Sequence, residues 1–118
     1  MRKVYHLSTC STCKRILKEL APPDGFVLQD IKTEAISESQ LDEMKELAGS
    51  YEALFSRRSR KYAELGLAGK ELSESEIRSL ILQEYTFLKR PVFIIDDEVF
   101  IGNSKKTVEA LLLQGLGG

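Results

Sequence analysis

Two cysteines spaced Cys-x-x-Cys are the residues of this chain best suited to do chemistry. Cys10 and Cys13 are its only cysteines, and they lie between an apolar run in residues 4–7 and a helical pattern of leucine and isoleucine. A thiolate is the nucleophilic form of cysteine, and a helix N-terminus or a nearby cation lowers the pKa of a thiol. We expect Cys10 to be the nucleophile and Cys13 to resolve a mixed disulfide formed on it.

Two other interpretations of the cysteine pair stay open. A zinc site needs four ligands, and the chain offers one imidazole, His6, beside the two thiols and its carboxylates. The cysteines could also be inert and buried. We place redox chemistry first because the pair lies between a strand-like run and a helical pattern. We expect no metal, since His6 is the only imidazole, and a reducing cytoplasm seldom keeps such a pair as a structural disulfide.

Composition limits the classes of protein to consider. The 118 residues suit one domain with an ordinary core. With 17 basic and 18 acidic residues the net charge is −1, so direct nucleic-acid binding is not expected. The N-terminus lacks a signal-like apolar segment, and no run approaches the ~20 apolar residues of a membrane helix. We expect a soluble, monomeric, cytoplasmic protein with no membrane contact.

The elements that position the cysteines follow from the apolar pattern. Residues 3–7 alternate as a strand, a helix begins with Ser11 or Thr12 as its N-cap and stops at residues 22–25, and residues 26–31 form a second strand. A helix between two strands makes a βαβ unit with a parallel pair. Residues from about 36 to 86 carry helical patterns, two of them starting at Ser37 and Ser73, which predicts an insert of three or four short helices.

The end of the chain completes the fold. Two apolar runs flank the acidic residues 96–98, which is typical of an antiparallel hairpin, and a last helix begins at Ser104 with an apolar stripe reaching Leu116. The order β-α-β, helical insert, β-β-α predicts an α/β, thioredoxin-like fold with a four-stranded mixed sheet in a single domain over residues 1–118. In that fold a cis-proline begins the third strand beside the active turn, so we expect Pro91 to be cis, with a trans proline at a strand start as the alternative.

Three separated motifs resemble the arsenate-reductase-related ArsC/Spx family, over residues 3 to about 113. They are Tyr5-His6-x-x-x-Cys10-x-x-Cys13-Lys14, Leu54-Phe55-Ser56-Arg57-Arg58-Ser59-x-x-Tyr62-x-x-Leu65-Gly66-Leu67, and Arg90-Pro91-Val92 before an acidic hairpin. The resemblance implies a nucleophile at Cys10 and two oxyanion-binding arginines at Arg58 and Arg90, whose guanidinium groups could also stabilise a thiolate. It also implies a site histidine at His6, for which an ordinary half-buried strand histidine is the alternative.

The sequence departs from the arsenate reductases of that family near the thiols. Those enzymes have Ser where this chain has Cys13 and Arg where it has Lys14, and they carry a third arginine beyond the hairpin, where this chain has Phe100-Ile101-Gly102-Asn103-Ser104. The Cys-x-x-Cys form resembles instead the Spx-type regulators, which use the pair as a thiol/disulfide switch and bind RNA polymerase. These departures favour disulfide chemistry over arsenate reduction.

The resemblance therefore implies two functions. The first is an arsenate-reductase-like thiol-disulfide oxidoreductase acting on an anionic substrate, which we rank first because two arginines accompany the thiols; Lys14, Ser11 and Thr12 are further candidates for anion binding. It would bind no cofactor and take electrons from a small thiol or a redox protein such as glutathione, glutaredoxin or thioredoxin. The alternative is a redox-switched transcriptional regulator with RNA polymerase as its partner.

Overall fold

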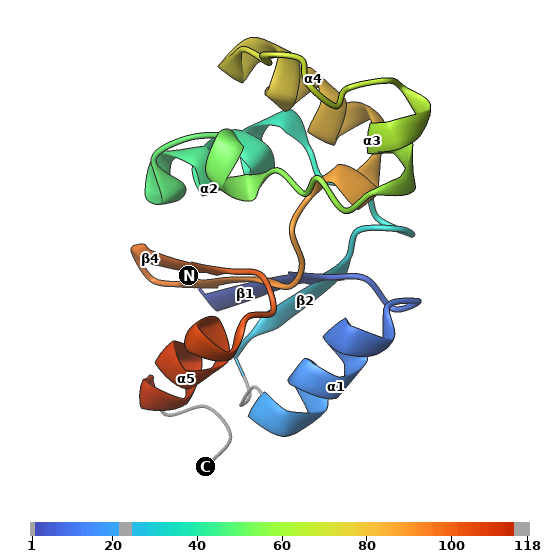
Figure 1. Cartoon of the computed structure of the whole chain (residues 1–118). Helices are drawn as coiled ribbons and strands as arrows, with labels where there is room; N and C mark the ends of the chain where they lie inside the picture. Colours follow the sequence, from blue (N-terminus) through green and yellow to red (C-terminus); the bar gives the residue numbers. More distant parts are fainter. Residues whose placement is uncertain (1, 22–24, 115–118) are drawn as a thin grey trace. The chain divides into compact units, whose positions relative to one another are not determined.

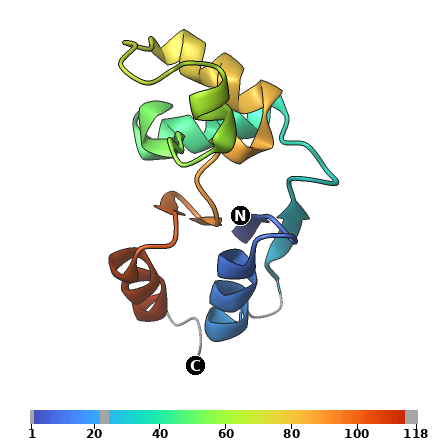
Figure 2. The ribbon, with the colours of Figure 1, turned by 45° about the vertical axis from the view of Figure 1, so that its right-hand side comes forward.

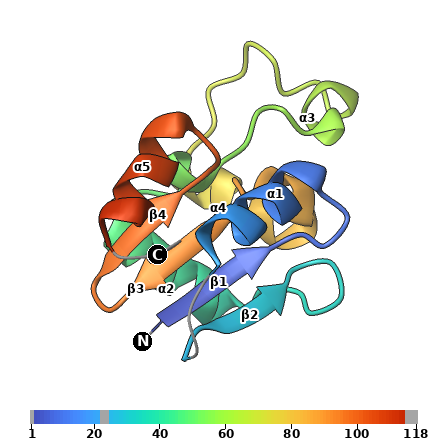
Figure 3. The same ribbon diagram turned by 90° about the horizontal axis from the view of Figure 1, so that it is seen from below.

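Four strands form one mixed sheet in the order β2-β1-β3-β4 (Figure 3). The central strand β1 (Arg2–His6) pairs in parallel with β2 (Val27–Asp30) and antiparallel with β3 (Val92–Ile95), and β3 pairs antiparallel with β4 (Glu98–Ile101). The computed structural model describes residues 2–21 and 25–114. This sheet, with its helices, confirms the predicted α/β, thioredoxin-like fold.

Two helices cover one face of the sheet (Figures 1 and 3). They are α1 (Ser11–Leu20), which connects β1 to β2, and α5 (Lys105–Leu113), which follows β4. Alternate strand residues point to the same face, so Val4 and its cross-strand partner Phe93 meet these helices. The resulting core consists of Val4, Ile16, Leu20, Phe93 and Leu111, all at most 1% exposed. It fixes the helix that starts beside Cys10 against the central strands.

Residues 36–89 form a second compact unit, and the first unit takes in the chain before and after it. The second unit is helical (Figure 2), with α2 (Glu38–Ala48), α3 (Arg60–Glu64) and α4 (Glu74–Gln83), and the 3-10 helices η1 (Glu52–Leu54) and η2 (Tyr85–Phe87). Its range lies close to the insert expected at about 36–86. Three α-helices in this fully described range agree with the predicted three or four.

Local capping signals explain where the two longest helices of this unit begin. The Ser37 side chain accepts the Gln40 amide at 3.1 Å while the Gln40 side chain accepts the Ser37 amide at 3.0 Å. Ser73 and Glu76 repeat this reciprocal pair at 3.2 and 3.1 Å. Each capping box satisfies two amide donors that a helix start leaves unpaired, so the predicted starts at Ser37 and Ser73 are confirmed.

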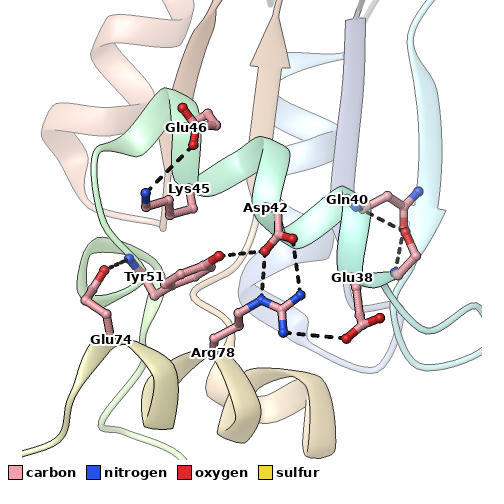
Figure 4. Close-up of polar contacts among 9 residues, drawn as sticks. Glu38, Gln40, Asp42, Lys45, Glu46, Tyr51, Glu74 and Arg78 are labelled. Carbon is pink, nitrogen blue, oxygen red and sulfur yellow. Dashed lines mark hydrogen bonds and ion pairs between the residues drawn. The ribbon is translucent and has the colours of Figure 1, made fainter.

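A polar network joins α2 to α4 in the second unit (Figure 4). The Arg78 guanidinium donates to both oxygens of Asp42, at 2.8 and 3.1 Å, and the Tyr51 hydroxyl donates to Asp42 at 2.6 Å. The Glu74 carboxylate accepts the amides of Tyr51 and Glu52, at 2.7 and 3.1 Å. The charged side chains of this network therefore pair with one another or accept hydrogen bonds from the amides at the start of η1.

The end of the chain follows the predicted order. A turn at Asp96 and Asp97 closes the β3–β4 hairpin, with Asp96 at φ 57°, and Ser104 caps α5 by accepting the Thr107 amide at 3.2 Å. Leu116 and the predicted helix stop at residues 22–24 lie outside the described residues. Within the ranges that the structure describes, no helix is both long and apolar enough to span a membrane.

Candidate active site

Cys10 is the N-cap residue of α1, with φ −92° and ψ 114°. Its amide donates to the Leu7 carbonyl at 3.0 Å, and its carbonyl accepts the Lys14 amide at 3.1 Å. The prediction of Ser11 or Thr12 as the N-cap is therefore wrong, because both residues already lie inside α1. The turn closed by Cys10 and Leu7 brings the chain into the helix earlier than side-chain preference alone would suggest.

The surroundings of Cys10 favour its thiolate. Partial burial raises the pKa of the Cys10 thiol, but the Cys13 amide, the Cys13 thiol, the Thr12 amide and the positive charge of Arg90 together hold it below the ordinary value of 9.0. The sulfur makes no conventional capping bond, yet these amides lie close enough to stabilise a negative charge on it. A half-exposed thiol with a lowered pKa is a better nucleophile than an ordinary cysteine.

Cys13 has the opposite character. It lies in the first turn of α1, is fully buried, and carries a free thiol. Burial raises the pKa of the Cys13 thiol to about 11, and the neighbouring Cys10 adds to the increase, while the Leu7 amide and Arg90 act against it. The pair thus combines one accessible, acidic thiol with one protected, neutral thiol.

Arg90 and Pro91 begin the last segment of the first unit, which starts at residue 90. The Arg90–Pro91 peptide bond is cis, the isomer that the order of elements predicts. The Arg90 side chain is half-buried, and its charge lowers the pKa of both thiols. The Pro91 carbonyl accepts the Gly102 amide at 2.9 Å, which holds the start of β3 against the end of β4. Arg90 is therefore close enough to Cys10 and Cys13 to act electrostatically on both thiols.

The other predicted site residues are placed as follows. Lys14 and Ser11 are exposed on α1, and Thr12 is half-buried with its amide at Cys10. His6, the last residue of β1, is half-buried, and its charge helps to lower the pKa of Asp30. Within residues 2–21 and 25–114, no three His, Cys, Asp or Glu side chains are grouped to hold a metal ion.

Arg58 belongs to the second unit. Its side chain is exposed in the segment before α3, and its amide donates to the Ser56 hydroxyl at 3.4 Å. The preceding Arg57 is engaged, pairing with Glu52 at 2.7 Å and lying over the Phe55 ring. A role for Arg58 at the thiols stays a prediction.

Sequence reasoning missed Asp30, the last residue of β2. Its carboxylate accepts the amide of Ser8 and the hydroxyl of Ser8, at the point where the chain leaves β1. Ser8 and Asp30 are 22 positions apart. The one available signal was an acidic residue ending the strand that the βαβ unit places beside the first strand.

Comparison with known proteins supports a common fold. A structure from Bacteroides fragilis described as an ArsC family related protein superimposes with a TM-score of 0.77 at 23% identity, over 93% of this chain and 97% of that chain. An arsenate reductase from Vibrio cholerae gives 0.75 at 17% identity, over 95% of both chains. A possible arsenate reductase from Streptococcus mutans gives 0.70 at 26% identity, over 94% and 97%.

The family itself is shown by sequence. No curated protein gives a significant match to the chain. The family model described as the ArsC family, however, matches residues 5–111, a range that includes both cysteines, Arg58 and the cis-proline. The chain belongs to the ArsC family.

Proposed function

We propose that this protein is an arsenate-reductase-like thiol-disulfide oxidoreductase that acts on an anionic substrate through Cys10 and Cys13. The observation that carries the proposal is the inequality of the two thiols at the start of α1: burial raises the pKa of Cys13 to about 11, while that of Cys10 is lowered. Membership of the ArsC family supports thiol-based, reductase-like chemistry.

The proposed reaction begins with the Cys10 thiolate. It attacks one sulfur of a substrate disulfide, forms a mixed disulfide, and displaces the other sulfur as a thiolate that takes the bonding electron pair. Cys13 then loses its proton and attacks the Cys10 sulfur, which forms the Cys10–Cys13 disulfide and releases the second substrate thiolate. Two electrons have passed from the protein to the substrate. A small thiol or a redox protein, such as glutathione, glutaredoxin or thioredoxin, returns them.

The first step also prepares the second. In the resting protein, Cys10 contributes to the raised pKa of Cys13 both through its charge and through a hydrogen bond. A mixed disulfide on Cys10 carries no negative charge, so both contributions disappear when the intermediate forms. The pKa of Cys13 then falls, although burial still raises it, so the resolving thiol loses its proton more readily than in the resting protein.

Cationic and polar groups around Cys10 support an anionic substrate. Arg90 lies near both thiols, and a guanidinium group can bind an oxyanion with two hydrogen bonds. Lys14 and Ser11 are exposed on the first turns of α1. We propose Arg58 as the second arginine from its place in the family motif.

An activity panel tests this proposal. Arsenate, glutathione disulfide and a protein disulfide are each offered, with a thiol donor, to the wild type, Cys10→Ser, Cys13→Ser, Arg58→Ala and Arg90→Ala. We expect disulfide reduction that requires Cys10, a trapped mixed disulfide in Cys13→Ser, and a raised KM for anionic substrates in both arginine variants. Turnover that survives Cys10→Ser, or no turnover of any substrate, would refute the proposal.

A second candidate function is a redox-switched regulator of the Spx type. Cys13, the resolving thiol that the arsenate reductases of the family lack, favours it, because a reversible disulfide can act as a switch. Under this function the reduced or the oxidised protein, but not both equally, binds RNA polymerase. A pull-down of purified polymerase with wild type and Cys13→Ser, each reduced and oxidised, distinguishes this regulator from the enzyme.

A further inference from the structure

The Asp30 carboxylate accepts hydrogen bonds from Ser8, in the turn that leads to Cys10. Its Oδ1 atom accepts the backbone amides of Ser8, at 3.3 Å, and of Lys32, at 3.1 Å. Its Oδ2 atom accepts the Ser8 hydroxyl at 2.5 Å. One carboxylate at the end of β2 therefore holds the residue two places after the end of β1.

Ser8 lies in the turn that places Cys10. Residues 7–10 form this turn, with Ser8 and Thr9 at its centre, and the Cys10 amide closes it by donating to the Leu7 carbonyl at 3.0 Å. Because Asp30 holds both the amide and the hydroxyl of Ser8, it restricts the turn whose last residue is the N-cap of α1. In this N-cap geometry the Thr12 and Cys13 amides lower the pKa of Cys10.

We propose that Asp30 is a positioning residue for Cys10, which keeps the Ser8 turn in the geometry that lets the α1 amides stabilise the thiolate. The inference rests on the proposed function in taking this thiolate to be the reacting group. A carboxylate suits the task because charge-assisted hydrogen bonds are about twice as strong as neutral ones.

The negative charge of Asp30 and its positioning role predict opposite effects on the pKa of Cys10. Hydrogen bonds from Ser8 and Lys32, with the charge of His6, hold the pKa of Asp30 below its ordinary value of 3.8, so Asp30 is an anion at neutral pH. Like charges oppose each other, so loss of this charge alone would lower the pKa of Cys10. Loss of the turn geometry would raise it, because the amide hydrogen bonds would weaken while Arg90 stays in place. The sign of the change therefore identifies the role.

The test measures the rate at which iodoacetamide alkylates Cys10 in the reduced full chain, as a function of pH. The variants are Asp30→Asn, Ser8→Ala and the double variant, and Asp97→Asn in the exposed hairpin turn is the charge-matched control. We expect both single variants to raise the midpoint and to slow alkylation at pH 7 by about threefold to tenfold. The double variant should be alkylated no more slowly than the slower single variant, because both changes disrupt the same hydrogen bond between Ser8 and Asp30. The control should match the wild type.

An unchanged or lowered midpoint in Ser8→Ala and Asp30→Asn, with circular dichroism like that of the wild type, would overturn the inference. If Asp30→Asn does not fold, Ser8→Ala decides the question, because it removes only one hydroxyl and changes no charge. Alkylation needs no substrate or electron donor. A protein that fails to reduce any disulfide would therefore refute the proposed function and leave this measurement standing.

Discussion

Asp30 and Asp42 are both half-buried carboxylates with lowered pKa values, but they serve different partners. Asp30, in the first unit, accepts hydrogen bonds from a serine hydroxyl and from backbone amides of two loops. Asp42, in the second unit, accepts the guanidinium of Arg78 and the phenol of Tyr51. One carboxylate shapes a turn that ends in a reactive thiol, whereas the other ties two helices together.

The comparison teaches where reactivity can arise in this chain. In the second unit the charges of Asp42 and Arg78 satisfy each other, so neither is left to act on a substrate. In the first unit, the helix start at Cys10 keeps its amides and the charge of Arg90 directed at a sulfur atom. We therefore expect changes in the first unit to alter thiol chemistry, and changes around Asp42 to alter stability.

Replacing the nucleophile should give the largest effect. Cys10→Ser is expected to lower the rate of glutathione disulfide reduction by on the order of a thousandfold or more, because a hydroxyl with an ordinary pKa replaces the thiolate. Cys13→Ser should keep the first attack and accumulate a mixed disulfide with glutathione. Mass spectrometry of the non-reduced protein measures that adduct. A Cys13→Ser protein that turns over at the wild-type rate would show that Cys13 does not resolve the intermediate.

A matched pair of core changes sharpens the contrast between the units. Ile16 in α1 and Ile81 in α4 are each about 1% exposed. Ile16→Val and Ile81→Val each remove one buried methylene and should lower the free energy of unfolding by about 0.5–1.5 kcal/mol in urea titrations. Ile81→Val should leave the pH midpoint of Cys10 alkylation unchanged. A shifted midpoint in Ile81→Val would mean that thiol reactivity depends on the packing of the second unit.

Arg90 should have a smaller effect on the reactivity of the thiol, in addition to the raised KM expected for anionic substrates. Arg90→Met removes the charge that lowers the pKa of Cys10, so the alkylation midpoint should rise and the rate at pH 7 should fall by about threefold. Arg90→Lys keeps the charge and should restore most of the rate. Lys106→Met, an exposed change on α5 with the same loss of charge, serves as the control. Equal effects of Arg90→Met and Lys106→Met would point to net charge rather than to a local contact.

Much of the fold could be predicted because its signals are local. Ser37 and Ser73 mark helix starts within four residues of sequence, and the acidic turn at Asp96 and Asp97 lies between two apolar runs. The Cys-x-x-Cys spacing likewise located the thiol pair at the turn between a strand and a helix. Each of these features depends only on residues that are close together in sequence. The alternation of a strand and the 3.6-residue repeat of a helix therefore reveal them.

The rest of the site depends on contacts between distant residues. Cys10, Ser11 and Thr12 are consecutive polar residues, and the Leu7–Cys10 turn, held by Asp30 from 22 positions away, decides which of them caps α1. No periodic pattern carries that information. The raised pKa of Cys13 is also tertiary in origin, because its main cause is the burial of that thiol in the core. Arg58 was suggested by family resemblance alone.

The smallest predicted effect lies in the second unit, at Asp42. Hydrogen bonds from Arg78 and Tyr51 lower the pKa of Asp42 from 3.8 to about 2. A depressed folded-state pKa stabilises the protein above the unfolded value, so this contribution is complete above about pH 4 and disappears as the pH falls through about 2. Asp42→Asn should lower the thermal midpoint at pH 7 by about 2–4 °C.

The gap between Asp42→Asn and the wild type should narrow as the pH falls from 4 toward 2, which differential scanning calorimetry can follow. Glu46→Gln on the same helix is the control, since the exposed Glu46 contacts only Lys45, at 3.7 Å, among the ion pairs of the described residues, and such pairs contribute little. Added salt should shrink the Asp42 effect, because the network is open to solvent. If Asp42→Asn instead changed Cys10 alkylation and left the thermal midpoint alone, the division of labour between Asp30 and Asp42 would be wrong.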